Sequence, residues 1–410
     1  MKMPNVRTRI APSPTGFAHV GTAYIALFNL AMARKNKGKF ILRIEDTDKK
    51  REVEGGIKVI EEGLKWLGFT WDEFYRQSDR LDVYKKYAQR LLDEDKAYEE
   101  DGGIILRVPR EYVSWQDLIR GEITFPKEEM KDFAIIKKDG FPTYNFAVVV
   151  DDIEMKISHV IRAEDHISNT PRQITVYQAL GAALPEFGHM PLLRNADRSK
   201  ISKRKNPVAL SWYQQEGYLP EALVNFLCLL GWSHPEEKEI FSFDDFVKNL
   251  DLARVRKTGP IFDRDKLDWI NGEYIREMKN EDLKAKIYDF FEGKYDKDLV
   301  EKLVPLVKTR IKTLKEFDSL CSFFLATSEV EVDRKLLGRN YKKHLAAAIA
   351  ALEKNESLDK VPQKNGFKVG DFFMDLRIAL TGQKITPPIN ESIEILGREE
   401  SIKRLQKVLG

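Results

Sequence analysis

A histidine and a glycine near the N-terminus are placed where they could bind a phosphate. His19 is followed by Val20-Gly21-Thr22 and comes directly after the loop Pro12–Gly16, in which two prolines and a glycine exclude helix and strand. We place His19 at or just before the first turn of a helix, where unpaired backbone N–H groups and the helix dipole favour an anion. The imidazole would add a donor, and Gly21 leaves the backbone bare, so a purine ring could lie flat on it. A lone His-x-Gly pair is more often structural, but the preceding loop favours a nucleotide site.

A basic run far downstream forms a second candidate phosphate site. Lys200-Ile201-Ser202-Lys203-Arg204 brings lysines and a hydroxyl together within a short segment. Such a run alone is usually solvated surface, but this one follows an α/β segment that ends in Met190–Leu193. Two phosphate sites in one chain indicate an enzyme that activates a carboxylate with ATP.

The elements that must position the first site form a βαβ unit. Alternating residues predict a strand over Val6–Ile10, and an apolar stripe predicts a helix over Ala18–Lys37 that ends at Gly38. A second strand follows over Lys39–Ile44. This order predicts a parallel sheet with a right-handed crossover, and therefore an α/β Rossmann-type catalytic domain.

The rest of the chain divides into a further α/β part and a helical part. The stretch 99–154 is β-rich and predicts a short α+β insertion between two halves of the catalytic domain. From about residue 221 onward, amphipathic segments predict an all-α region. The further elements we expect are helices over 53–67, 79–96, Ile167–Leu180, Asp298–Leu320, Arg334–Lys354 and Ile389–Leu409, and strands over Ile104–Val108, Phe133–Lys137, Tyr144–Val150 and Ile157–Ile161.

Composition limits the classes of protein. A chain of 410 residues suggests two or three domains, and 42% hydrophobic with 32% charged residues is typical of a soluble protein with real cores. The net charge is only +3, so any nucleic-acid contact must come from local patches. Cys228 and Cys321 belong to no Cys-x-x-Cys or Cys/His cluster, which predicts buried free thiols, no disulfide and no structural zinc. No apolar signal region or long apolar run occurs, so we expect a cytoplasmic protein without a membrane segment.

Arg9–Thr22 together with Arg43–Asp48 resembles the N-terminal signature of glutamyl-tRNA synthetases. These are class I aminoacyl-tRNA synthetases whose His-Ile-Gly-His motif often takes the form His-Val-Gly-Thr, so Thr22 stands in place of the second histidine. Residues 200–204 resemble the class I Lys-Met-Ser-Lys-Ser loop. The resemblance covers most of the chain, with later landmarks in family order at Tyr144–Phe146, Val160–His166, Leu219–Leu223 and Leu376–Gly382.

The resemblance implies that the lysine loop holds the pyrophosphate as it leaves. Negative charge grows on the departing oxygens as the bond between the α- and β-phosphates breaks, and a lysine that follows this charge acts most strongly in the transition state. We assign this role first to Lys203 and second to Lys200. The expected catalytic residues are His19, Gly21, Thr22, Lys200, Ser202 and Lys203, and the expected ATP contacts are Pro12, His19, Gly21, Asp165, Ile201 and Lys203. Mg²⁺ is expected to arrive with ATP, because no protein-only metal cage is visible in the sequence.

A glutamate substrate carries two carboxylates and one ammonium group, so its site needs two cations and an acidic partner. The resemblance implies that Arg9 binds the side-chain carboxylate, Arg162 a substrate carboxylate and Glu45 the α-amino group. His166 either contacts the substrate or has a structural role. The full set expected around glutamate is Arg9, Ala11, Ser13, Glu45, Tyr144, Arg162 and His166. Since the substrate carboxylate is already a nucleophile, positioning and charge neutralisation suffice for catalysis.

The tRNA-facing parts follow from the same resemblance. Arg310 matches an arginine associated with reading anticodon bases, with Arg377 and Lys384 as further candidates, and the alternative for Arg310 is a solvated helix face. The insertion is short for the family and lacks the Cys/His zinc cluster of some members. The expected domains are the first catalytic half at 1–98, a shortened acceptor-binding insertion at 99–154, the second catalytic half with the lysine loop at 155–205, a helical stem-contact region at 206–280 and an all-helical anticodon-binding region at 281–410.

The expected activity is that of a monomeric glutamate–tRNA ligase acting on ATP, L-glutamate and tRNA(Glu), and charging of tRNA(Gln) as well stays open. Glutaminyl-tRNA synthetases usually carry β-barrel anticodon domains, which the helical tail argues against. A truncated paralogue that glutamylates a modified tRNA base lacks the anticodon part. A third alternative is a non-catalytic tRNA-binding paralogue, which the intact His19, Gly21, Lys200 and Lys203 argue against.

Overall fold

The computed structural model describes residues 5–48, 53–201, 207–325 and 330–410. The chain folds into two compact units. Unit 1 comprises Met1–Gln215 and Leu219–Ile270, and unit 2 comprises Glu216–Tyr218 and Asn271–Gly410. Across the described ranges, no helix combines the length and the apolar character that are needed to cross a membrane.

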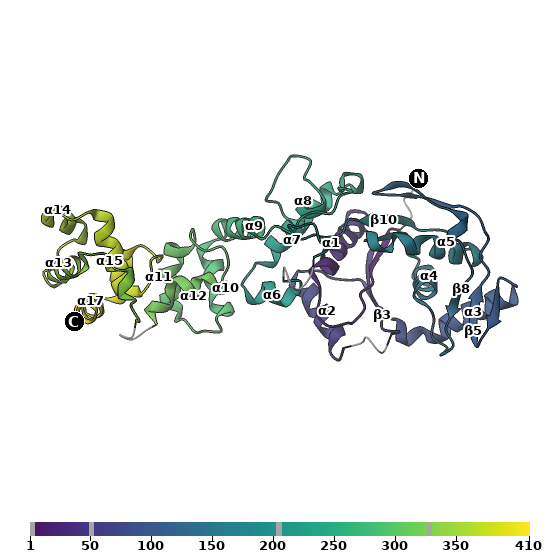
Figure 1. The fold of residues 1–410 in the computed structure, drawn as a ribbon, viewed down its shortest axis with the longest axis horizontal. Helices are drawn as coiled ribbons and strands as arrows, with labels where there is room; N and C mark the ends of the chain where they lie inside the picture. The colour runs from purple at the N-terminus through teal and green to yellow at the C-terminus, as the bar shows by residue number, and fades with distance from the viewer. Residues whose placement is uncertain (1–4, 49–52, 202–206, 326–329) are drawn as a thin grey trace. The chain divides into compact units, whose positions relative to one another are not determined.

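Parallel strands form the centre of unit 1 (Figure 1). β2 (Lys39–Ile44) pairs in parallel with both β1 (Arg7–Ile10) and β3 (Glu73–Arg76), and β9 (His159–Ala163) pairs in parallel with β10 (Glu186–Met190). The N–H just before β9 donates to a carbonyl of β1 at 3.0 Å, so β1 and β9 lie side by side. β2 and β3 extend outward from β1 on one side, and β10 extends outward from β9 on the other. The boundary between β1 and β9 is the kind of place where doubly wound α/β folds bind ligands, because the strand order changes direction there.

Helix α1 (Val20–Lys35) crosses from β1 to β2 and begins at His19, whose backbone is extended (φ −90°, ψ 138°). Gly38 follows the helix and passes so close to the start of β1 that an added Cβ would lie 2.0 Å from the carbonyl oxygen of Val6. The predicted strand–helix–strand unit is confirmed, with small shifts at the ends. The other helices of unit 1 are α2 (Gly56–Trp66), α3 (Leu81–Asp93), α4 (Tyr144–Glu154), α5 (Thr170–Ala179), α6 (Leu210–Gln215), α7 (Pro220–Gly231) and α8 (Phe243–Asn249).

The strand predicted over Tyr144–Val150 is wrong, because these residues form the start of α4. The β-branched run Val148-Val149-Val150 favours a strand when it is judged alone. In α4, however, every residue from Phe146 to Asp152 is buried, so the helix shows no polar face whose period would reveal it. Thr143, in an extended conformation, precedes its first turn.

The segment between α3 and α4 contributes to two different sheets. β4 (Ala97–Glu100), β5 (Gly103–Leu106) and β8 (Phe133–Ile136) form an antiparallel sheet, which contains the strands expected near 104–108 and 133–137. The hairpin of β6 (Val113–Asp117) and β7 (Gly121–Phe125) instead joins β10, with Phe187 opposite Asp117. The hairpin therefore reaches the sheet that carries β9 and β10.

In unit 2, the described residues form helices and no strands. The three long helices predicted there are each interrupted. The helix predicted over Asp298–Leu320 divides into α11 (Lys297–Val307) and α12 (Glu316–Cys321). The first turn expected at Arg334 is a separate 3₁₀ turn, and the helix predicted over Ile389–Leu409 breaks at Gly397, whose φ is 84°. The helices are α9 (Arg264–Glu277), whose residues divide between the units, α10 (Asn280–Phe290), α11 (Lys297–Val307), α12 (Glu316–Cys321), α13 (Tyr341–Glu353), α14 (Val361–Asn365), α15 (Val369–Thr381), α16 (Ile389–Leu396) and α17 (Arg398–Leu409).

The two cysteines are both buried and free, as expected. Cys228 lies in α7 of unit 1 and Cys321 ends α12 of unit 2. Among the described residues, no group of three His, Cys, Asp or Glu side chains is arranged to hold a metal ion.

Candidate active site

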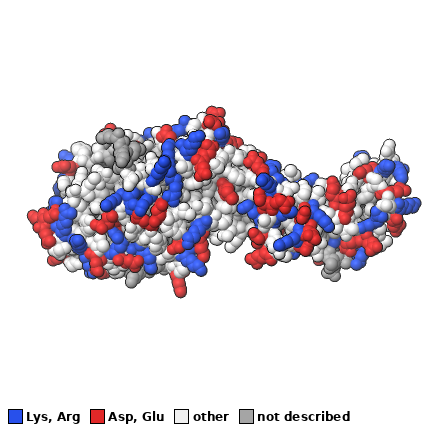
Figure 2. Space-filling view, turned by 180° about the vertical axis from the view of Figure 1, so that it is seen from behind, with Lys and Arg blue, Asp and Glu red and all other residues white. Residues whose placement is uncertain are grey.

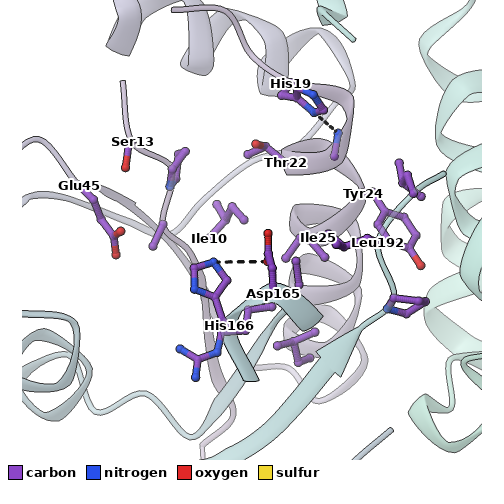
Figure 3. Close-up of a pocket in the computed structure, with 18 of the residues that line it drawn as sticks. Ile10, Ser13, His19, Thr22, Tyr24, Ile25, Glu45, Asp165, His166 and Leu192 are labelled. Carbon is purple, nitrogen blue, oxygen red and sulfur yellow. Dashed lines mark hydrogen bonds and ion pairs between the residues drawn. The ribbon is translucent and has the colours of Figure 1, made fainter. Parts of the chain in front are cut away.

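A cavity of about 460 Å³ opens at the carboxyl ends of β1, β2 and β9. Figure 3 shows Ser13 and Glu45 on one side of it, His19 and Thr22 at the start of α1, and Asp165 beside His166. The sequence-predicted site residues that line this one cavity are Arg9, Ala11, Pro12, Ser13, His19, Gly21, Thr22, Glu45, Tyr144, Arg162, Asp165, His166, Lys200 and Ile201. The fold thus brings together both predicted phosphate sites and the predicted amino-acid site. Ser202 and Lys203 lie outside the described residues.

The hydrogen bonding of His19 determines which of its two ring nitrogens is a donor. Its Nδ1 accepts a hydrogen bond from the backbone N–H of Gly21 at 2.9 Å (Figure 3). A neutral imidazole that accepts at Nδ1 carries its proton on Nε2, which makes Nε2 a donor. A Cβ at position 21 would lie 3.0 Å from this same Nδ1, so glycine lets the ring and the backbone approach. As the N-cap of α1, His19 therefore carries an N–H donor on Nε2 at the helix start, where the helix dipole also favours an anion.

Two buried arginines and three carboxylates form one cluster, of which Arg9 and Glu45 line the cavity. Asp152 accepts from Arg9 at 3.3 and 3.4 Å and from Nη1 of Arg43 at 2.6 Å. Arg43 also lies 3.5 Å from Glu45 and 3.6 Å from Asp151. Burial raises the pKa of Glu45 to about 7, against the opposing charges of Arg43 and Arg9. At neutral pH Glu45 is therefore near the midpoint of its titration, and a cation placed beside it would favour its charged form.

Sequence reasoning missed the two aspartates of this cluster. Asp151 and Asp152 are buried in α4, next to the apolar run that was expected to be a strand. Arg43, which the sequence identified only as part of the motif Arg43–Asp48, is fully buried in β2. The charged residues inside these otherwise apolar segments could have revealed the cluster, because a buried charge needs a partner of opposite charge.

Arg162 is buried yet makes no direct ion pair within the part of the chain that the structure describes. Its guanidinium donates to Gln173 at 2.7 Å, to Thr170 at 2.8 Å and to Nε2 of His189 at 3.2 Å. Burial lowers the pKa of Arg162, and the neighbouring Arg9 charge acts in the same direction. Within the described residues, all hydrogen-bond acceptors of Arg162 are therefore neutral, and no carboxylate is bonded to its guanidinium.

His166 and Tyr144 form a pair on the wall of the cavity. The Tyr144 hydroxyl lies 3.1 Å from Nδ1 of His166. Burial, with the nearby Arg162 charge, lowers the pKa of His166 to about 4. His166 is therefore a neutral hydrogen-bonding residue at pH 7. Its place on the wall suits contact with a substrate, and its bond to Tyr144 suits a structural role.

Lys200 and Ile201 bring the lysine loop to the cavity. Lys200 Nζ lies 3.0 Å from Asp165 Oδ2, and Ile201 is buried. The N–H of Ile201 donates to the carbonyl of Leu193 at 3.0 Å, and the Asn195 side chain donates to the carbonyl of Lys200 at 3.0 Å. The start of the loop is thus fixed against the segment that follows β10.

Unit 2 brings together the three residues predicted to face tRNA. Arg310 Nη1 donates to the carbonyl of Thr386 at 3.3 Å, and Arg377 Nε donates to the Thr386 hydroxyl at 3.1 Å. Lys384 lines one surface hollow with Arg310 and Ile385, which is 71% exposed. Burial and the Arg310 charge lower the pKa of Arg377. On the face shown in Figure 2, basic and acidic side chains are interspersed, and the described residues form no continuous basic surface there.

Comparison with known proteins identifies the family. Residues 5–103 and 100–269 match the family described as tRNA synthetases class I (E and Q), catalytic domain, and residues 276–409 match the anticodon binding domain. A glutamate–tRNA ligase of Acidothermus cellulolyticus is 41% identical over 98% of this chain and 95% of its own length. The chain belongs to the glutamate–tRNA ligase family of class I synthetases.

Other members of this family align over the whole chain. A glutamate–tRNA ligase of Thermus thermophilus is 40% identical over 98% of this chain and 100% of its own length. The crystal structure of a glutamate tRNA ligase from Elizabethkingia meningosepticum, in complex with its amino acid, superposes with a TM-score of 0.85 at 30% identity and covers 99% of both chains. The predicted fold class, an α/β catalytic part followed by a helical anticodon-binding part, is confirmed.

Proposed function

We propose that the protein is a glutamate–tRNA ligase. It joins L-glutamate to the AMP part of ATP, which forms glutamyl-adenylate and releases pyrophosphate. It then passes the glutamyl group to the 3′-terminal adenosine of tRNA(Glu) and releases AMP. The observation that carries this proposal is one cavity in which an arginine–carboxylate cluster lies beside the His19 cap and Lys200. The names of the family members given above support the same reaction.

The amino-acid end of the cavity suits an acidic amino acid. Arg9 would bind the side-chain carboxylate, Arg162 a second carboxylate and Glu45 the α-ammonium group. Tyr144, His166, Ser13 and the backbone at Ala11 would complete the hydrogen bonds. Two guanidinium groups with one carboxylate match the charges of glutamate, since fork-shaped arginine prefers carboxylates.

The nucleotide end of the cavity suits ATP. The purine would lie against Gly21, with Pro12, Asp165 and Ile201 around it and Thr22 behind the His19 donor. Lys200, Ser202 and Lys203 would neutralise the charge that develops on the leaving pyrophosphate. Mg²⁺ would arrive with ATP and be held chiefly by phosphate oxygens and its own waters, with Asp165 as a carboxylate lining the same cavity.

The reaction needs no acid–base pair. The substrate α-carboxylate is already a nucleophile, so the residues of the cavity accelerate the reaction by placing it in line with the α-phosphate and by neutralising charge. Lys200 would exchange its bond with Asp165 for a bond with phosphate. No zinc is invoked at any step.

The tRNA-binding assignments belong to the same proposal. The short segment 99–154 would guide the acceptor end, residues 206–280 would contact the stem and residues 281–410 would bind the anticodon. Arg310, Arg377 and Lys384 would read anticodon bases by edge hydrogen bonds and stacking. We expect a monomer that works in the cytoplasm, where tRNA charging supplies translation.

Exchange of labelled pyrophosphate into ATP, measured with glutamate in the presence and absence of tRNA, tests the first step. Exchange that depends on glutamate supports the proposal, and its absence even with tRNA(Glu) favours a non-catalytic tRNA-binding paralogue. Charging assays with purified tRNA(Glu) and tRNA(Gln) then distinguish a strict enzyme from one that also charges tRNA(Gln). Aspartate and glutamine serve as amino-acid controls.

A further inference from the structure

A chain of three buried side chains connects the β6–β7 hairpin to the glutamate end of the cavity. Asp117 ends β6, His189 lies in β10 and Arg162 lies in β9. Asp117 Oδ2 is 2.5 Å from Nδ1 of His189, and Nε2 of His189 is 3.2 Å from Nε of Arg162. Their exposed fractions are 2%, 0% and 6%. Solvent therefore makes little contribution to this chain of hydrogen bonds.

The direction of each bond follows from the chemistry of the groups. Arginine Nε is only a donor, so Nε2 of His189 must accept its hydrogen bond. Nδ1 then carries the ring proton and donates it to Asp117. Burial lowers the pKa of His189, which keeps the ring neutral despite the opposing pull of Asp117. The Asp117 carboxylate thus selects the one neutral tautomer that can hold Arg162.

The hairpin turn holds this carboxylate in place. Asp117 Oδ1 accepts from the backbone N–H groups of Ile119 at 3.0 Å, Arg120 at 2.9 Å and His189 at 3.2 Å. The Arg120 side chain in turn pairs with Glu164 at 2.5 Å. One carboxylate oxygen is therefore fixed by the backbone, and the other remains for the imidazole.

Arg162 differs in this respect from Arg9 on the same cavity wall. Arg9 pairs directly with Asp152, so a substrate carboxylate there would share the guanidinium with another anion. Arg162 is held by three neutral side chains, and the carboxylate behind it acts only through the imidazole. This arrangement orients the guanidinium without placing a competing anion on it.

We propose that Asp117 and His189 are positioning residues for Arg162, which they orient toward a carboxylate of the amino-acid substrate without neutralising it. The proposal deepens the function proposed above and rests on it. It also means that the segment between α3 and α4, expected to serve the tRNA acceptor end, supplies a residue on which amino-acid binding depends.

Three variants test the two hydrogen bonds of this chain, Asp117 to His189 and His189 to Arg162, separately. His189→Asn keeps an amide near the Nδ1 position, facing Asp117, but loses the acceptor for Arg162. His189→Gln places an amide oxygen near the Nε2 position and so restores that acceptor. Asp117→Asn can donate to Nδ1, which moves the ring proton to Nε2 and sets two N–H groups against each other. His159→Gln, a buried histidine on β9 that is bonded to Ser158, is the matched control.

The assay is glutamate-dependent pyrophosphate exchange with saturating tRNA(Glu), with KM measured separately for glutamate and ATP. We expect His189→Asn and Asp117→Asn to raise KM for glutamate about tenfold or more, the effect of losing one hydrogen bond to a charged group. KM for ATP should stay within about twofold, since ATP contacts neither residue in this scheme. His189→Gln should recover most of the loss, and His159→Gln should match the parent.

Several results would overturn the proposal. It fails if His189→Asn leaves KM for glutamate unchanged, if KM for ATP rises in parallel, or if His189→Gln is no better than His189→Asn. In an Arg162→Lys background, which lacks the Nε donor, His189→Asn should add less than about twofold, and a full additional loss also contradicts the proposal. If the His189→Asn protein does not fold, KM for glutamate is compared between Asp117→Asn and His189→Gln instead. A parent protein without exchange refutes the proposed function itself, whereas an active parent with unaffected variants refutes only this inference.

Discussion

Glu45 gives a test in which stability and binding should change in opposite directions. Burial raises its pKa from the ordinary 4.5 to about 7 in the free protein. A carboxyl group whose pKa rises on folding contributes stability that is fully present below pH 4.5 and is lost as the pH rises to about 7. Glutamine is neutral at every pH. We predict that Glu45→Gln stabilises the free protein above pH 7 and has little effect near pH 5.

The size of the effect follows from the pKa. Each pH unit between 4.5 and about 7 is worth about 1.4 kcal/mol, so the limit is about 3 kcal/mol. The variant also loses the contact of Glu45 with Arg43 at 3.5 Å, although Arg43 keeps Asp151 and Asp152. We therefore expect a gain of about 1 to 3 kcal/mol in the free energy of unfolding at pH 8. KM for glutamate should rise about tenfold or more, because a charged partner of the α-ammonium group is gone.

Tryptophan fluorescence can follow this unfolding selectively, because all 6 tryptophans lie in unit 1. Urea unfolding of parent and variant at about pH 5 and about pH 8 gives the two differences. Glu73→Gln is a control of opposite sign. The hydrogen bond from Arg7 lowers the pKa of Glu73 to about 2, so its contribution is present above pH 4.5 and is lost as the pH falls toward 2. Glu73→Gln should therefore destabilise the protein at pH 8.

The reasoning about Glu45 is refuted by either of two results. One is a Glu45→Gln protein that is no more stable than the parent at pH 8. The other is a stability difference that is the same at both pH values, which would mean that packing and not ionisation is responsible. An unchanged KM for glutamate would separately remove Glu45 from the proposed site.

Three further predictions concern other parts of the chain. Lys203→Ala should lower the rate of glutamate-dependent pyrophosphate exchange by on the order of 10²-fold, and equal rates in variant and parent would remove that assignment. Tyr24→Phe deletes a buried hydroxyl that lies against Gly231 and has no hydrogen-bond partner among the described residues. Urea unfolding of this variant should therefore show equal stability or a gain of up to about 1 kcal/mol. A clear loss of stability would contradict this prediction. Arg310→Ala should raise KM for tRNA(Glu) in charging about tenfold while KM for ATP stays constant, and unchanged charging would favour a structural role beside Thr386.

Local patterns predicted the elements of unit 1 wherever one face of an element is solvated or a turn residue ends it. α1 was predicted by apolar residues at helical spacing and by Gly38. Because Ala23 to Ala31 are all buried, the glycine after its end was the clearer of these two signals. The pattern failed for α4, because burial of Phe146 to Asp152 on all sides removes the period that distinguishes helix from strand. In unit 2, the break at Gly397 was visible in the sequence as a glycine, but the flanking amphipathic segments continued on either side and concealed it.

The parts of the site that are encoded in short segments could be predicted from the sequence. The Pro12–Gly16 loop, the His19 cap with Gly21, and Glu45 directly after β2 each depend on neighbouring residues. Pro12 and Ser13 of the loop line the cavity together with His19, Gly21 and Glu45. The pairing of carboxylates with arginines and histidines became visible only in the folded chain. Arg9 meets Asp152 across 143 positions, and His189 meets Asp117 across 72. Such pairs form because strands and a buried helix pack side by side, and no local period in the chain records which distant segments will become neighbours.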